Sequence, residues 1–467
     1  SNNNGSIVVN STPDSLLDIT NHENNNWSNI SGNFNTQHSF SDSEKITFNA
    51  DYIYYRDDNP NTYLDNYNDA YGKFVRAQNI RSSKVTPIHF WVGALDYQKK
   101  FSAKVYMEAG IKASLSRFNN DVAVDNLLVD TWKTDSVYSA NSALKESILA
   151  AYTSFSYSLS RKTNMKVGLR YEYTNSNLGS QTEKNIVDRH YGRLFPSFFL
   201  SHKINDNNTW NVSYSRRITR PTFRDMAPFV IFMDPSTFFS GNPGLQPAIT
   251  NSANVAYTFK RIIFSVSYSY ETNTITNFTP SVNPVTNIET LAAANQKSNT
   301  IWAAALSVPV NVNKWWTMQY NVIGNSQALE GSVSGKPVTI KQDYLQLTSQ
   351  QSFNLPKDYS IELSAFYSTK TAFGVFTAPA FGELDLGVQK KFVKLHSNLR
   401  LDAGNILNSM KFRPYINYPE QNLIVKGELI FDYPVVSLTY THNFGNAKVK
   451  GTRNRSTGAE EEKGRVQ

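Results

Sequence analysis

The feature that most constrains this chain is a strict alternation of apolar and polar residues, repeated in segment after segment. In the clearest one, Ser102–Phe118, the odd-numbered residues from Ala103 to Leu115 are all apolar, while Lys104, Glu108 and Lys112 lie among the even-numbered ones. A period of two is that of a β-strand whose two faces meet different surroundings. We find about 17 such segments between residues 28 and 444, and almost no helical periodicity.

The connections between these segments alternate between two lengths. Short turns such as 41–44 and 161–163 alternate with long loops such as 57–86 and 119–141. Many strands exceed the usual length of about five or six residues in globular sheets. Long strands with tight turns at one end and long loops at the other predict an all-β transmembrane antiparallel barrel, since a sheet in lipid must close to pair its backbone polar groups. A soluble sandwich, propeller or solenoid is the alternative, but no repeat of about 40–50 residues supports a propeller.

The amino-acid composition excludes membrane-spanning helices, cysteine chemistry and a nucleic-acid partner. Only 40% of the residues are hydrophobic, so no segment is suited to cross a bilayer as a helix of about 20 residues. The chain has no cysteine, which excludes disulfides and thiolate metal sites. Its net charge of +8 is scattered rather than gathered on one face, so we expect no nucleic-acid partner.

The stretch from Trp210 to Thr250 contains two motifs that are similar to those of a known protein family. The run Tyr214–Pro221 (YSRRITRP) and the run Gly241–Pro247 (GNPGLQP) resemble the barrel of TonB-dependent receptors, and more closely the Bacteroidetes outer-membrane β-barrel family. The segment 453–462 (RNRSTGAEEE) is similar to the C-terminal tail of that family. Ala248 stands where family members commonly have Glu, so the resemblance implies no salt bridge from that position to the arginines.

The resemblance implies energised uptake of a scarce nutrient, such as a siderophore, cofactor, glycan or peptide, across the cell outer membrane. The implied partners are outer-membrane lipids, the TonB complex, a plug domain that this sequence lacks, and a possible surface lipoprotein or other complex subunit. A passive porin or a surface-binding scaffold is the alternative function. Enzymatic activity is not expected, because the seven histidines are scattered without a catalytic or metal-binding spacing, and we predict no cofactor, no metal and no catalytic residue.

The strand count predicts the domain boundaries. We expect an extracellular loop or disordered start over residues 1–27, the transmembrane barrel over 28–444 and a polar, disordered periplasmic tail over 445–467. Short turns of such barrels face the periplasm, so both the first and the last strand run towards it. Because bacterial barrels usually have an even number of strands, we expect about 17 strands of a barrel of about 22, with upstream strands absent.

The candidate site residues lie in the two motifs and in the last strand. Arg216, Arg217 and Arg220 cluster where a strand leaves the membrane, and alternation sends Arg216 and Arg217 to opposite faces. They could bind an anionic ligand, plug carboxylates or lipid phosphates, or anchor the long loop, which is the role we favour. We expect this stretch to shape the extracellular mouth. The loop-shaping residues are Pro221, Gly241, Asn242, Pro243 and Pro247, and the barrel-terminal signal comprises Leu438, Tyr440 and Phe444.

Overall fold

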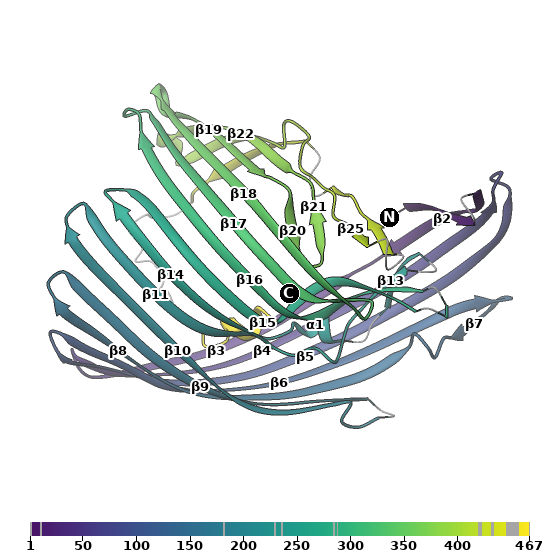
Figure 1. Cartoon of the computed structure of the whole chain (residues 1–467), viewed down its shortest axis with the longest axis horizontal. Coiled ribbons are helices and arrows are strands. Elements are labelled where there is room, and N and C mark those ends of the chain that lie inside the picture. The colour runs from purple at the N-terminus through teal and green to yellow at the C-terminus, as the bar shows by residue number, and fades with distance from the viewer. Residues whose placement is uncertain are drawn as a thin grey trace.

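A computed structural model describes the chain except for residues 1, 10–11, 181–182, 228–229, 235–236, 284, 287, 419–422, 431–433, 445–456 and 467. Most of the described residues lie in one large twisted sheet that curves into a barrel wall (Figure 1). This sheet has 22 strands, and 17 of them form the wall once the short or peripheral β1, β2, β7, β12 and β13 are set aside. The predicted fold class and the count of about 17 strands are therefore confirmed.

The wall strands lie next to one another almost in chain order. They are β3 (Asn26–Ser41), β4 (Glu44–Asp69), β5 (Phe74–Ser102), β6 (Val105–Leu128), β8 (Ala140–Ser160), β9 (Thr163–Ser180), β10 (Val187–Asn205), β11 (Asn208–Thr219), β14 (Ala248–Phe259), β15 (Ile262–Val282), β16 (Glu289–Asn311), β17 (Trp316–Val333), β18 (Lys336–Leu355), β19 (Tyr359–Ser368), β22 (Phe381–Phe392), β23 (Ser397–Gly404) and β28 (Val435–His442). Each pairs antiparallel with the next wall strand.

The smaller strands and helices decorate the long-loop end of the wall or lie inside it, whereas two 3₁₀ turns lie in short turns at the other end. They are β1 (Asn2–Val9), β2 (Thr12–Glu23), β7 (Thr131–Thr134), α1 (Phe223–Met226), β12 (Val230–Asp234), β13 (Thr237–Ser240), β20 (Thr371–Phe373), β21 (Phe376–Ala378), β24 (Lys411–Phe412), β25 (Tyr415–Tyr418), β26 (Leu423–Lys426), β27 (Leu429–Ile430) and α2 (Glu460–Lys463), with single 3₁₀ turns at Pro356–Asp358 and Val393–Leu395. Within the described residues, no helix is long and apolar enough to cross a membrane.

Several predicted long loops are instead continuations of the strands. The predicted loop 57–86 is a β-hairpin whose strands β4 and β5 stay paired as far as Asn68 and Phe74. Likewise β6 continues to Leu128, well past the expected end at Phe118. The prediction placed the strand ends too early because the outward residues turn polar there, although continued pairing still satisfies the backbone N–H and C=O groups.

The two faces of the wall have the composition expected of a barrel in lipid. On β6, Ile111 and Leu115 are exposed on the outer face, at 59% and 51% of their surface, whereas Ser114 and Ser116 are buried on the inner face. Leu149 of β8 is likewise 56% exposed. Exposed apolar residues outside and buried polar residues inside invert the pattern of a soluble sheet, and this is the pattern of a membrane-spanning barrel.

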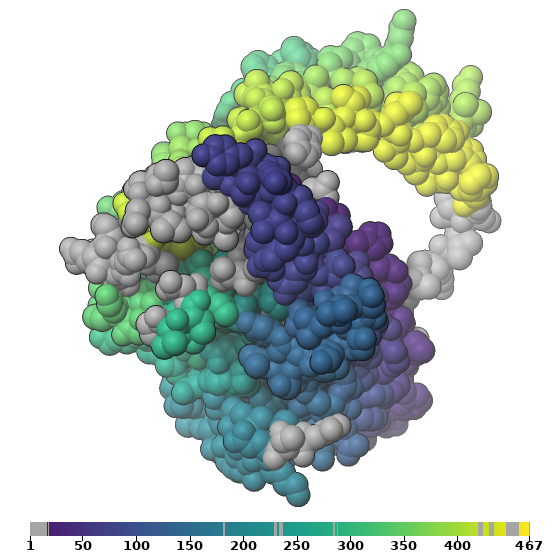
Figure 2. Space-filling view, turned by 90° about the vertical axis from the view of Figure 1, so that its right-hand side faces the viewer, coloured from purple at the N-terminus to yellow at the C-terminus, as the bar shows by residue number. Residues whose placement is uncertain are grey.

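The wall has two long edges. Within the described residues β3 pairs only with β4, and β28 pairs only with β23. Figure 2 shows a gap between the C-terminal strands, in yellow, and the N-terminal part of the wall, in purple and blue. Unpaired strand edges are costly in hydrocarbon, so the expectation that the complete barrel has about 22 strands stays a prediction.

Regular structure is present near both ends of the chain. Strands β1 and β2 form an antiparallel hairpin, and β2 pairs with residues 61–69 at the long-loop end of β4. Residues 457–466 lie inside the barrel, where α2 forms a single helical turn (Figure 1). The expected disorder of the tail is therefore wrong for residues 457–466; the expected periplasmic location of the tail as a whole stays a prediction.

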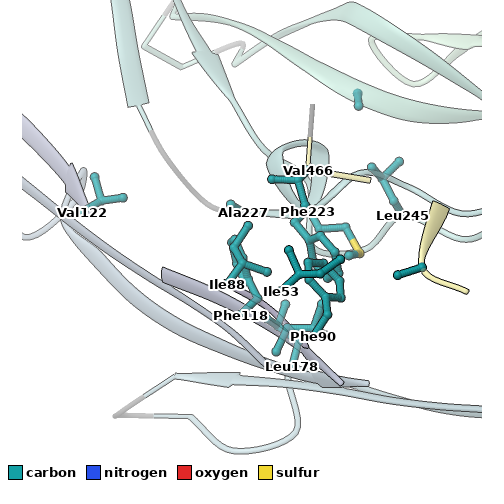
Figure 3. Packing of buried hydrophobic residues seen from close by; sticks show 14 of the residues in the cluster. Ile53, Ile88, Phe90, Phe118, Val122, Leu178, Phe223, Ala227, Leu245 and Val466 are labelled. Atoms are coloured by element: carbon teal, nitrogen blue, oxygen red, sulfur yellow. The ribbon is translucent and has the colours of Figure 1, made fainter. Parts of the chain in front are cut away.

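The largest apolar cluster also lies inside the barrel. Figure 3 shows wall residues such as Phe90 and Phe118 packed around Phe223 of α1, with Leu245 and Val466 nearby. Wall, loop and tail thus share one core. The stretch after Thr219 reaches further into the barrel than the sequence indicates, because Phe223, Met226 and Leu245 are buried in this core. Its role in shaping the extracellular mouth stays a prediction.

Candidate functional site

The loop that follows β11 enters the lumen as a short capped helix. The hydroxyl of Thr222 accepts a hydrogen bond from the Asp225 backbone N–H at 3.0 Å, and the Asp225 carboxylate accepts one from the Thr222 N–H at 3.2 Å. This capping box satisfies N–H groups that a buried helix end would leave unpaired. It also presents Phe223 to the wall, where its ring centroid lies 5.5 Å from that of Phe90 and 5.6 Å from that of Phe118.

The GNPGLQP motif fastens the rest of this loop to the wall. The Asn242 side chain donates to the Ala293 carbonyl of β16 at 3.0 Å and accepts from the Gly244 N–H at 2.9 Å. Arg189 of β10 donates to the Gly244 carbonyl at 2.6 Å. At Gly241 an added Cβ would collide with the Ala227 carbonyl, so only glycine fits this approach of two backbones.

Among the proline residues proposed to shape this loop, Pro221 is buried, while Pro243 and Pro247 are half-buried. Each fixes its own φ angle in an irregular segment that has little other secondary structure. Pro221 also offers its carbonyl to the tail.

The C-terminal segment makes hydrogen bonds to the backbone of this loop. The Phe223 N–H donates to the Arg465 carbonyl at 3.0 Å, and the Arg465 Nε donates to the Pro221 carbonyl at 3.2 Å. The guanidinium carbon of Arg465 lies 4.4 Å from the centroid of the Phe223 ring, a cation–π contact. Loop and tail therefore form one unit inside the barrel.

Arg220 connects that unit to the wall through ion pairs. Its side chain is only 2% exposed and donates to Glu172 of β9 and to Glu461 of α2, both at 2.6 Å. It also donates to the Thr174 hydroxyl at 3.2 Å. Burial alone would lower the pKa of Arg220, but the charge and hydrogen bond of Glu172, followed by the charge of Glu461, raise that pKa above its usual value. Arg220 therefore stays cationic.

Two further ion pairs join the tail to neighbouring wall strands. Glu462, 3% exposed, pairs with Lys112 of β6 at 3.0 Å. Arg465 pairs with Glu146 of β8, and both side chains are nearly buried. We call the following seven residues the lumenal cluster: Lys112, Glu146, Glu172, Arg220, Glu461, Glu462 and Arg465.

The ion pairs of the lumenal cluster connect the loop and the tail to the wall. The cluster's three cations and four carboxylates are joined by ion pairs, so each buried charge has a partner of opposite sign. Residues that could hold a metal ion do not gather in groups of three or more anywhere in the described part of the chain. The arrangement can hold a segment across the lumen, and it can release that segment if the pairs are broken.

The other predicted site residues lie elsewhere. Arg216 is half-buried opposite Asn251 on the face of the exposed Tyr214, whereas Arg217 is exposed on the opposite face. Ala248, where family members commonly have Glu, is fully buried. The barrel-terminal residues Leu438, Tyr440 and Phe444 are 62–89% exposed in and just after the edge strand β28. The structure thus brings only Arg220 of the three arginines into the lumenal cluster.

Sequence reasoning missed most of the lumenal cluster. Alternation places Lys112 on the polar face of its strand, and the tail contains three consecutive glutamates. No sequence signal indicates that this lysine and these glutamates pair with each other. Charges more than 300 residues apart can pair only because the wall curves around the tail. Residues 453–456 of the tail motif lie outside the described part of the chain.

A family model matches most of this sheet. The model of the outer membrane protein beta-barrel family matches residues 37–440. The chain belongs to this family. Its location is therefore the outer membrane, as predicted. A comparison with curated protein sequences gave no significant match.

Solved structures share the fold at low sequence identity. The siderophore receptor PiuA from Acinetobacter baumannii aligns with a TM-score of 0.54 at 9% identity, over 91% of this chain and 76% of that one. The copper transporter OprC gives a TM-score of 0.54 at 10% identity, over 85% and 71%. The ferric yersiniabactin uptake receptor FyuA from Yersinia pestis gives 0.52 at 10%, over 89% and 74%. The resemblance to a TonB-dependent receptor barrel is confirmed at the level of fold, while a Bacteroidetes origin stays a prediction.

Proposed function

We propose that this chain is the barrel of an energised outer-membrane transporter that takes up a scarce nutrient. The observation that supports this best is the lumenal cluster, which fastens a loop and a tail segment across the inside of the wall. A passive porin needs an aqueous channel through its lumen. In this barrel a loop and a tail segment occupy part of the lumen, and their buried ion pairs must be broken before those segments can leave it.

The free energy needed to break these ion pairs favours release of the loop and tail by an energy source over their spontaneous release. Leaving one partner of a buried ion pair uncompensated costs about 3–5 kcal/mol. Arg220, Lys112 and Arg465 each hold such a pair. Spontaneous release of all three together is therefore rare, whereas a mechanical pull from the periplasmic side could supply the energy. The TonB complex is the partner that the sequence resemblance implies for that role.

The solved structures with this fold include receptors for siderophores and a transporter for copper. At sequence identities near 10%, these structures support a shared fold but do not indicate which substrate this chain transports. We therefore propose uptake of a scarce nutrient, such as a siderophore, cofactor, glycan or peptide, and no narrower class.

Uptake in whole cells tests the proposal. Cells expressing the full-length protein are supplied with radiolabelled iron-siderophore mixtures, cobalamin, or oligosaccharides, with and without an uncoupler of the proton-motive force. Accumulation that requires the protein and stops with the uncoupler is the expected result. Uptake that persists in the uncoupler, together with steady single-channel conductance of the purified protein in planar bilayers, would instead establish a passive pore. Surface binding without accumulation would establish a scaffold.

A further inference from the structure

Arg117 of β6 and Lys145 of β8 form an unusual pair on the outer face of the wall. They lie directly opposite each other in the β6–β8 register, and both are exposed. Two like charges at facing positions of an antiparallel pair destabilise the sheet. Such a pair is expected where an anion lies between the two cations.

Neither of the residues that face the pair across the neighbouring strands is a carboxylate. Across β5 the partner of Arg117 is His89, and across β9 the partner of Lys145 is Asn177. Within the described residues, neither Arg117 nor Lys145 makes an ion pair. Nearby outward carboxylates are already engaged: Asp121 accepts a hydrogen bond from Asn141, and Asp188 pairs with His190 at 3.1 Å.

The height of the pair on the wall matches the level of lipid headgroups. One step towards the short turns on the same face lies Leu115, 51% exposed, and two steps below Lys145 lies Leu149, 56% exposed. Beside them Trp91 stacks on His89 with 5.7 Å between centroids, as aromatic residues do at a membrane interface. The long-loop end of such a barrel faces outside, so the two cations lie where the outer leaflet meets water.

The pair also borders a groove. A depression of about 670 Å³ is lined by Trp91 and Leu115 on its apolar side and by Arg117, Lys145, Asn175 and Asn177 on its polar side. Ser116, Ser147 and Glu146 also line it, and the Glu146 carboxylate is paired with Arg465. An acyl chain fits the apolar side, while amide groups can hydrogen-bond hydroxyl groups of a sugar. The guanidinium of Arg117 offers a planar fork to phosphate oxygens, and Lys145 adds a second positive charge.

We propose that this groove binds a phosphorylated lipid of the outer leaflet, with the phosphate between Arg117 and Lys145 and an acyl chain against Trp91 and Leu115. The charge of the ligand offsets the repulsion between the two cations. The site lies on the outer surface of the wall and does not depend on the transport function proposed above.

Binding of a defined lipid to the purified full chain tests the site. Native mass spectrometry measures occupancy by lipid A with two phosphates, by the same lipid with its phosphates removed, and in the presence of millimolar inorganic phosphate. We expect Arg117→Gln/Lys145→Gln to weaken binding of the phosphorylated lipid by about tenfold or more, since bonds to charged groups are among the stronger hydrogen bonds. The charge-conserving Arg117→Lys should retain most of the binding.

A matched control removes two charges from the other end of the wall. Lys162 lies in the short turn between β8 and β9, and Lys203 lies near the end of β10, where it pairs with Asp206 of the next short turn at 2.8 Å. Lys162→Gln/Lys203→Gln should leave lipid occupancy unchanged. An equal loss in this control, equal binding of the lipid without phosphates, or displacement by inorganic phosphate would each overturn the proposal. If the double variant fails to fold, Arg117→Gln alone should still lower occupancy severalfold, and unchanged occupancy would count against the site.

Discussion

Replacing Arg220 by Gln should release the C-terminal segment from the wall without unfolding the barrel. Arg220 is the only residue of the lumenal cluster in the loop, and it contacts both Glu172 on the wall and Glu461 on the tail. Gln removes the charge and keeps most of the polar length of the side chain. The expected result is a tail that undocks more often, because Glu172 loses a buried partner while Glu461 is free to return to water.

The loss of docking free energy in Arg220→Gln can be estimated from the contacts that remain. Removing one partner of a buried pair costs about 3–5 kcal/mol. Two features lower that figure: Arg170 still contacts Glu172, and Glu461 is already 42% exposed. We therefore expect docking to weaken by about 2 kcal/mol, which raises the undocked population about thirtyfold.

Cysteine labelling measures this directly, because the chain has no cysteine of its own. Val466, 8% exposed in the core, is replaced by Cys, and its reaction rate with a water-soluble maleimide is measured with and without Arg220→Gln. A second position, Val124→Cys, is fully buried on the inner wall and reports unfolding of the barrel itself. The rate at position 466 should rise about thirtyfold while the rate at position 124 stays unchanged.

Arg217→Gln is the matched control, since Arg217 belongs to the same motif but is exposed. It should change neither rate. An unchanged rate at position 466 in Arg220→Gln, or an equal rise in Arg217→Gln, would refute the reasoning that Arg220 fastens the tail.

Three further changes test the contacts inside the barrel, the first two with the labelling assay and the third by denaturant titration. Gly241→Ala places a methyl group against the Ala227 carbonyl, so the loop must shift at a cost of about 1–3 kcal/mol, and labelling at position 466 should accelerate. Arg465→Glu should undock the tail, and adding Glu146→Arg should restore part of the docking, whereas an additive double variant would argue against a direct pair. Phe223→Ala removes a ring that is 1% exposed and should lower stability in denaturant titration by about 3 kcal/mol; a change below about 1 kcal/mol would show that the ring contributes little.

The wall could be predicted from sequence because each strand carries its own evidence. On β6 the alternation of Ile111, Lys112, Ala113 and Ser114 identifies the strand and assigns its faces without reference to any other segment. The short turns then order the neighbours, because antiparallel strands joined by a tight turn must pair. This local information was enough for the architecture and the strand count.

The interior could not be predicted in the same way. Whether the loop after Thr219 stays at the mouth or enters the lumen depends on whether an apolar surface is available there, and that surface is built by Phe90 and Phe118 from strands far away in sequence. Alternation does place both residues on the inner face, which is an unusual position for Phe in a polar lumen. Aromatic residues on the inward face were the overlooked signal that something apolar packs against them.

The strand pair β6–β8 combines the two proposed sites in adjacent positions. Lys145 points outwards to the lipid groove, while the next residue, Glu146, points inwards and holds Arg465. Because the two side chains lie on opposite faces and share no partner, their effects should be independent. Lys145→Gln should therefore weaken lipid binding and leave tail labelling unchanged, and Glu146→Gln should do the reverse. If either variant changed both measurements, the wall would have to move as the tail undocks, and lipid bound outside would then bias the state of the lumen.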